Sequence, residues 1–169
     1  MKNFLKKQTI STYLAFASFV FAFVGFIVYL SNMAAEGYFK GPVNPLIVLF
    51  SLIALIALIG VLVLTQFAFQ GFVKKILDFV LDALAIVAPV LLLAGMMYFI
   101  SDRAQGLAYI YGSDANVLTE IQTPANLASA TTAIVGFIFY GIAALVGIVA
   151  SFFRLPKDKT EEDATQKAA

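Results

Sequence analysis

Four long apolar runs, separated by short polar segments, dominate the amino-acid sequence. They cover residues 11–31, 45–69, 77–100 and 124–153, and only the third contains charged residues. A helix of about 20 residues crosses the ~30 Å hydrocarbon core of a bilayer, so each run is long enough to span it. The pattern predicts an all-α integral membrane protein in which residues 1–153 form an antiparallel bundle of four transmembrane helices.

Proline and capping residues mark helix boundaries and interruptions. Thr123 suits the N-cap of the fourth helix and Pro124 its first turn, where a missing N–H group leaves no hydrogen bond unmade. Pro89 lies inside the third run, so we expect it to bend that helix. The second run is apolar on every face. It predicts a scaffold helix without a functional site, on which Leu58 would tolerate replacement by phenylalanine.

The polar residues gather in two segments outside the runs. Residues 101–123 form the largest polar connection, which we expect to be an outer loop with Gly106 and Gly112 at its turns. Residues 154–169 are charged and contain few large apolar side chains, a composition typical of a disordered tail.

The distribution of the 11 lysine and arginine residues predicts the orientation of the bundle. Nine lie on the side of the two termini and the short middle turn: Lys2, Lys6, Lys7, Lys74, Lys75, Arg154, Lys157, Lys159 and Lys167. Only Lys40 and Arg103 lie on the other side. Since basic residues accumulate on the cytoplasmic side, we expect both termini in the cytoplasm. The plain start of the chain and the absence of cysteine favour a bacterial plasma membrane.

Small and weakly polar residues form one line on the first predicted helix and another on the fourth. The first seam consists of Ser11, Ala15, Ser18, Ala22, Gly25, Tyr29 and Asn32. The second seam consists of Ser129, Ala133, Gly136, Tyr140, Ala144, Gly147 and Ser151. Both follow steps of three and four residues, and small residues let helices approach closely in lipid. We therefore predict that both seams are packing interfaces, and that the Tyr140 hydroxyl bonds Ser18.

Three charged residues share one face of an amphipathic segment at the start of the third helix. Lys74, Asp78 and Asp82 are spaced four residues apart. A carboxylate inside a bilayer is a candidate for ion or proton coupling. Ion pairing at the cytoplasmic interface, or contact with another subunit, explains the same set, because Asp82 lies only about 12 Å along the helix from Lys74. We favour the structural or docking interpretation.

The residue types that are missing exclude most catalytic chemistry. The chain has no cysteine and no histidine, which excludes thiolate chemistry, a Ser–His–Asp triad and the commonest metal ligand. The outer carboxylates Asp102, Asp114 and Glu120 lack the spacing of a calcium site, and no glycine-rich phosphate-binding motif occurs. We expect no enzymatic activity, no metal, no cofactor and no nucleic-acid binding.

The remaining features favour a protein that works through contacts in the membrane. We expect a non-enzymatic accessory or assembly subunit of a larger membrane complex, with a transporter as the favoured host. Its expected partners are membrane lipid and either other integral membrane subunits or further copies of itself. The alternative is a self-assembling channel, or a carrier of ions or small solutes, that uses Asp82 and the second seam to line a path.

Overall fold

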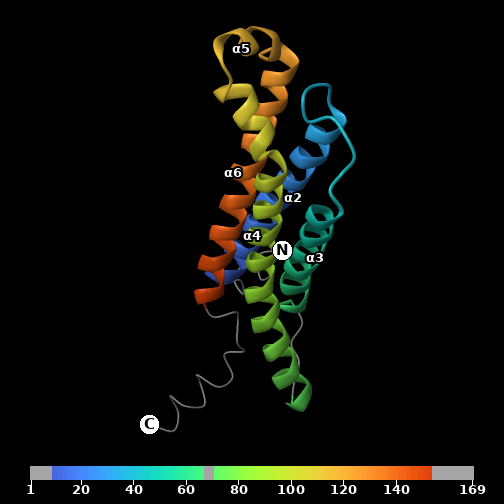
Figure 1. Ribbon diagram of the computed structural model, residues 1–169. Coiled ribbons are helices and arrows are strands. Elements are labelled where there is room, and N and C mark those ends of the chain that lie inside the picture. Colours follow the sequence, from blue (N-terminus) through green and yellow to red (C-terminus); the bar gives the residue numbers. More distant parts are fainter. Residues whose placement is uncertain (1–8, 67–70, 154–169) are drawn as a thin grey trace.

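The computed structural model describes residues 9–66 and 71–153, and its secondary structure there is all helical (Figure 1). The elements are α2 (Ile10–Ala34), α3 (Pro45–Leu64), α4 (Gly71–Gly112), the short α5 (Ala115–Ile121) and α6 (Pro124–Phe152). In the described part, four helices are long and apolar enough to cross a membrane. The all-helical architecture with four long apolar helices is therefore confirmed. The predicted tail, residues 154–169, lies outside the described residues.

Two of the helices begin at the side-chain caps that their sequences provide. The Thr123 side chain accepts a hydrogen bond from the Asn126 N–H group, and Pro124 occupies the first turn of α6, as predicted. The Asn44 side chain accepts from the Leu46 N–H group at the start of α3, where Pro45 follows. Each cap satisfies a backbone donor that the helix itself leaves unpaired.

The four long helices form a ring in which each packs against two neighbours. α2 packs most extensively against α6, α3 packs against α4, and the contacts α4–α6 and α2–α3 complete the ring. The largest fully buried side chains come from all four helices and include Tyr29, Ile47, Phe99 and Tyr140. The ring of Phe99 lies edge-on to Tyr29 at 4.9 Å between centroids, which places aromatic packing at the centre of the bundle.

α4 is much longer than the helices around it. It contains 42 residues, which corresponds to about 63 Å, and it continues without a break through Pro89. Ala85 lines one small hollow together with Ser11 of α2 and Ala150 of α6, near the ends of those helices. Residues 71–84, which we call the stalk, therefore extend about 21 Å beyond that level. Figure 1 shows α4 continuing past the ends of α3 and α6.

The segment expected to be an outer loop is largely helical. α4 continues to Gly112, and α5 follows after Asp114. Gly106 was predicted to be a turn point, but it is buried inside α4, where the rings of Tyr38 and Phe39 pack against it. The prediction failed because this segment is amphipathic: Arg103, Gly106 and Ile110 face inward at helical spacing, while most of its polar residues stay exposed on the helix surface.

Three smaller differences concern the second and third helices. The third helix begins at Gly71 and not at residue 77, so the amphipathic segment is part of α4 itself. α3 ends at Leu64, and residues 67–69 of its predicted span lie outside the described residues. Leu58 is only 3% exposed, so the tolerance expected for phenylalanine there does not follow from the structure.

Candidate functional site

The residues of the two predicted packing interfaces lie inside the bundle, where α2 meets α6. Ser18, Ala22 and Gly25 of α2 are buried there. The buried residues of the second seam are Ala133, Gly136, Tyr140, Ala144 and Gly147. A Cβ atom added to Gly25 would stand 3.1 Å from Cδ2 of Tyr140, so the glycine permits the close approach of the two helices.

The second seam also contacts α4. A Cβ atom on Gly136 would lie 2.6 Å from the Phe99 ring, and one on Gly147 would lie 3.1 Å from both the Ser18 hydroxyl and the Pro89 ring. The small residues of α6 therefore leave room for the side chains of Phe99 and Pro89 on α4. Both seams are occupied by helices of the same chain.

Three buried polar side chains connect α2 to the backbone of α6. The Ser11 hydroxyl donates to the Ala150 carbonyl at 3.0 Å, and the Ser18 hydroxyl donates to the Ala143 carbonyl at 2.8 Å. We call the end of the bundle near Gly112 the outer end and the end near Gly71 the inner end, as names taken from the predicted orientation. At the outer end, the Asn32 amide donates to the Ser129 carbonyl at 2.7 Å. Each such bond between helices contributes about 0.6–2 kcal/mol in a membrane, so together they fix the register of the pair.

The predicted partner of Tyr140 is wrong. Its hydroxyl lies 2.5 Å from the hydroxyl of Ser51 on α3. Ser51 donates its own proton to the Ile47 carbonyl, so Tyr140 is the donor to Ser51. Ser18 is occupied by the Ala143 carbonyl instead. The uniformly apolar second helix, expected to offer no site, thus supplies the one hydroxyl that Tyr140 needs.

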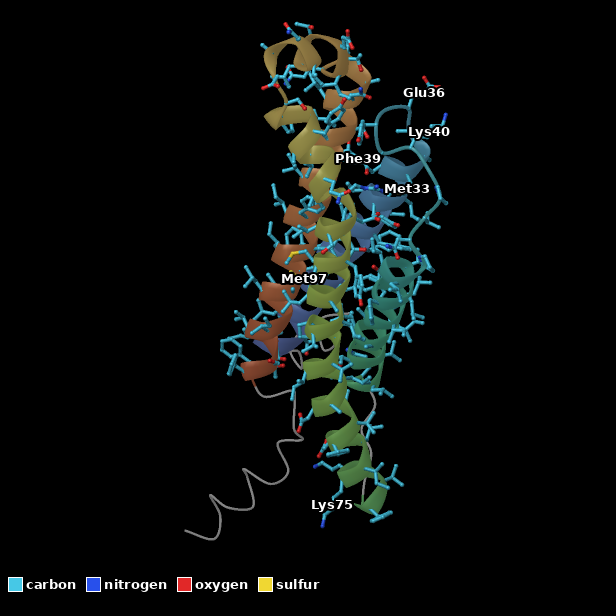
Figure 2. All side chains as sticks on the ribbon, in the orientation of Figure 1. Met33, Glu36, Phe39, Lys40, Lys75 and Met97 are labelled. Atoms are coloured by element: carbon cyan, nitrogen blue, oxygen red, sulfur yellow. The ribbon has the colours of Figure 1, made fainter. Side chains whose placement is uncertain are left out.

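Arg103 is a buried charged residue, although residues 101–123 were predicted to form an outer loop. It is 6% exposed, and its guanidinium carbon lies 4.7 Å from the centroid of the Phe39 ring. One guanidinium nitrogen lies 3.4 Å from the Asp102 carboxylate, and another contacts the sulfur atom of Met33. Figure 2 shows Met33 and Phe39 near the outer end of the bundle, on the side that faces α4. One feature of the sequence could have indicated this burial: Gly106 lies three residues after Arg103, so in a helix the two share a face, and a glycine on that face permits close packing.

Lys74, Asp78 and Asp82 all lie on the stalk. Asp82 is exposed, and Lys74 and Asp78 are half-buried. Within the described residues, no ion pair joins any two of the three. The small hollow at the level of Ala85 is lined by small and apolar side chains and Ser11, with no charged residue. The structure thus brings the three charges onto one projecting segment and places none of them in that hollow.

The described residues contain no cluster of three or more carboxylates that could hold a metal ion. Comparison of the chain with protein-family models, with curated proteins and with solved structures found no match. The candidate site therefore rests on geometry alone. It is the stalk, which extends past the ends of α2 and α6 and, apart from Leu81 and Leu84 near the bundle, carries charged and large apolar side chains that are exposed or half-buried.

Proposed function

We propose that this chain is a multi-pass membrane protein that acts as a non-enzymatic accessory or assembly subunit of a larger membrane complex. The observation that carries the proposal is the position of Lys74, Asp78 and Asp82. They stand on a helix segment that extends past the ends of α2 and α6, where a neighbouring subunit can reach them. A transporter is the favoured host, because carriers commonly work with helical partner subunits.

The interior of the bundle supports this proposal over a carrier. An ion-coupling carboxylate requires a polar, water-accessible cavity, and such residues face the interior of their bundles. Asp82 is exposed on the stalk. The described core is filled by aromatic and aliphatic side chains, with Tyr140 and Ser51 satisfying each other. A path through the bundle would need these contacts to separate.

We further propose that the bundle lies in a bacterial plasma membrane with both termini in the cytoplasm. The support is the bias of basic residues toward the side of the stalk. The chain has no cysteine, so single cysteines at Ser113 and Thr165 report the orientation cleanly. An impermeant thiol reagent added to intact cells should label the variant at position 113 only. Labelling at position 165 under the same conditions contradicts the orientation.

Partner recovery tests the function directly. The protein should be purified in mild detergent, and the proteins that accompany it should be identified and measured. We expect Lys74→Glu and Asp82→Asn to reduce partner yield about five- to tenfold, because removing one member of a desolvated charge pair costs well over 1 kcal/mol. The matched controls are Lys40→Glu and Glu36→Gln, which change exposed charges at the opposite end of the molecule.

Flux by the purified protein is the measurement that would contradict the proposal. The protein alone should be placed in sealed vesicles and assayed for ion-dependent transport. We expect no flux above that of empty vesicles. Robust flux that Asp82→Asn abolishes, with expression unchanged, would establish the carrier instead.

A further inference from the structure

The small hollow at the level of Ala85 lies where all four long helices meet. Its wall contains Ser11 of α2, Ala85 of α4, and Gly147 and Ala150 of α6, and apolar side chains of α2 and α3 complete it. Every residue of the wall is buried except Ala85, which is half-buried. The volume of the hollow, about 10 Å³, is at the lower end of the range that holds one water molecule.

Pro89 leaves one backbone carbonyl of α4 without its helical donor. In an α-helix each carbonyl accepts from the N–H group four residues later, and proline has no N–H group. The carbonyl concerned belongs to Ala85, and α4 continues through both residues without a break. The neighbouring N–H groups of a continuous helix serve the neighbouring carbonyls. The Ala85 carbonyl therefore needs a donor from outside the α4 backbone.

This carbonyl belongs to the wall of the hollow. Helical carbonyl groups point along the axis toward the next turn, so that of Ala85 points toward the level of Pro89. A Cβ atom on Gly147, which is also part of the wall, would lie 3.1 Å from Cβ of Pro89. The hydroxyl groups of Ser11 and Ser18 donate to carbonyls of α6, so neither gives its proton to Ala85.

We propose that the hollow binds a single water molecule, which donates one hydrogen bond to the Ala85 carbonyl and the other to the Ser11 hydroxyl oxygen. Ser11 gives its own proton to the Ala150 carbonyl at 3.0 Å, so its oxygen is left as an acceptor. Two polar partners are enough to hold a buried water. Ordered water is one of the means by which a membrane helix tolerates an internal proline.

The chemistry of the wall selects water over a metal ion. Calcium and magnesium ions take about six or more oxygen ligands, and carboxylates are prominent among them. The wall contains no carboxylate, and its oxygen atoms come from one hydroxyl group and the backbone. The Ala150 carbonyl already accepts from Ser11. The volume of the hollow also leaves no space for an apolar ligand.

The proposed water lies where the stalk leaves the bundle, because Ala85 is the first residue after the stalk. The missing backbone bond of α4 thus falls at this junction, and the water replaces it with a link to α2. This inference goes beyond the proposed function, since it holds whether or not a partner docks on the stalk. Its tests concern this chain alone, so its failure leaves the docking proposal standing.

A structure of the full chain in lipid, at a resolution that shows ordered water, tests the proposal directly. We expect density for one oxygen atom within about 3.2 Å of both the Ala85 carbonyl oxygen and the Ser11 hydroxyl. An empty hollow, or a protein donor on the Ala85 carbonyl, would overturn the proposal. Density surrounded by about six oxygen ligands would identify a cation and would overturn it as well.

A double-mutant cycle gives an independent test through the stability of the bundle. Ser11→Val removes the acceptor and fills the hollow, which leaves the Ala85 carbonyl unpaired. Pro89→Ala restores the missing N–H group, so in that background the carbonyl needs no water. The bond from Ser11 to Ala150 is lost in both backgrounds and cancels. Ser11→Val should therefore lower the folding equilibrium constant about fivefold or more beyond its effect in the Pro89→Ala background.

Ser18→Val in the same two backgrounds is the matched control. Ser18 also donates to a carbonyl of α6, and its hydroxyl lies as close as Pro89 to the Cβ position of Gly147, but it is not part of the wall. We expect its coupling to Pro89→Ala to be smaller than that of Ser11 by about fivefold or more. Equal or larger coupling at Ser18 would show that the bulk of the proline ring links the sites, and it would contradict the proposal.

Discussion

The outer and inner ends of α4 carry similar residues in different surroundings. At the outer end, Arg103 lies beneath the ring of Phe39 and is 6% exposed. At the inner end, Lys75 lies one turn from Phe72 and Phe79, and both rings are about three-quarters exposed. Figure 2 shows Lys75 near the end of α4 that extends past the other helices, far from the connections at the outer end.

The outer end is enclosed because a connection of the same chain folds onto it. The Phe39 N–H group donates to the Ser129 hydroxyl, which holds the connection between α2 and α3 against α6. Gly37 adopts a φ of +137°, and a Cβ atom there would lie 2.6 Å from the Ala125 carbonyl oxygen. Only glycine suits that position, because it combines a positive φ with close backbone approach.

A cation that lies beside aromatic rings is therefore not by itself a functional site. At the outer end, Phe39, Met33 and Asp102 of the same chain contact Arg103, although its guanidinium Nε has no hydrogen-bond partner among the described residues. These contacts stabilise the bundle. At the inner end α2 begins and α6 ends near the level of Ala85, and these two helices do not extend along the stalk. The inner end is therefore where contacts with other molecules are expected, and substitutions at the two ends should behave differently.

The largest effect is expected from Gly106→Leu at the outer end. A Cβ atom at this position already meets the rings of Tyr38 and Phe39, so a leucine side chain would force the connection off α4. We expect a loss of about 2–3 kcal/mol in the free energy of unfolding. The measurement is unfolding from mild detergent into sodium dodecyl sulfate. Gly112→Leu, on the same helix with no described atom within 4 Å of its Cβ position, is the control.

Arg103→Ala should have a smaller effect at the same end. It removes the cation–π contact with Phe39 and the packing of the long side chain, for which we expect a loss of about 1–2 kcal/mol. Lys40→Ala, at an exposed position in the same connection, should change stability by less than about 0.5 kcal/mol. Equal stability of the two variants in the same unfolding assay would show that the outer enclosure does not depend on Arg103.

Phe79→Ser at the inner end should have the smallest effect on the bundle itself. The ring is 75% exposed, so at protein concentrations where copies are separate we expect a change within about 0.5 kcal/mol. Gly106→Leu under identical conditions serves as the positive control. A loss of 2 kcal/mol or more for Phe79→Ser would mean that the stalk folds back onto its own bundle, and the contrast between the two ends would disappear.

The sequence predicted features that depend on one helix at a time. The apolar runs set the number and approximate length of the long helices. A segment that crosses a bilayer must be apolar and must satisfy its backbone hydrogen bonds internally, as a helix does. Steps of three and four residues placed Gly25 and Gly136 on defined helix faces, and Thr123 with Pro124 fixed where α6 begins. The shared location of Lys74, Asp78 and Asp82 on one segment followed from the same periodicity.

Features that depend on which helices are neighbours required the tertiary structure. Periodicity gives the angle of a side chain around its own helix, but not the helix that it meets or at what height, so Tyr140 was assigned Ser18 and in fact reaches Ser51. Residues 101–112 read as a loop because their polarity suggests water. Their helix buries one face, on which Arg103 meets Phe39 and Met33 and Gly106 meets the rings of Tyr38 and Phe39, and it leaves most polar side chains exposed.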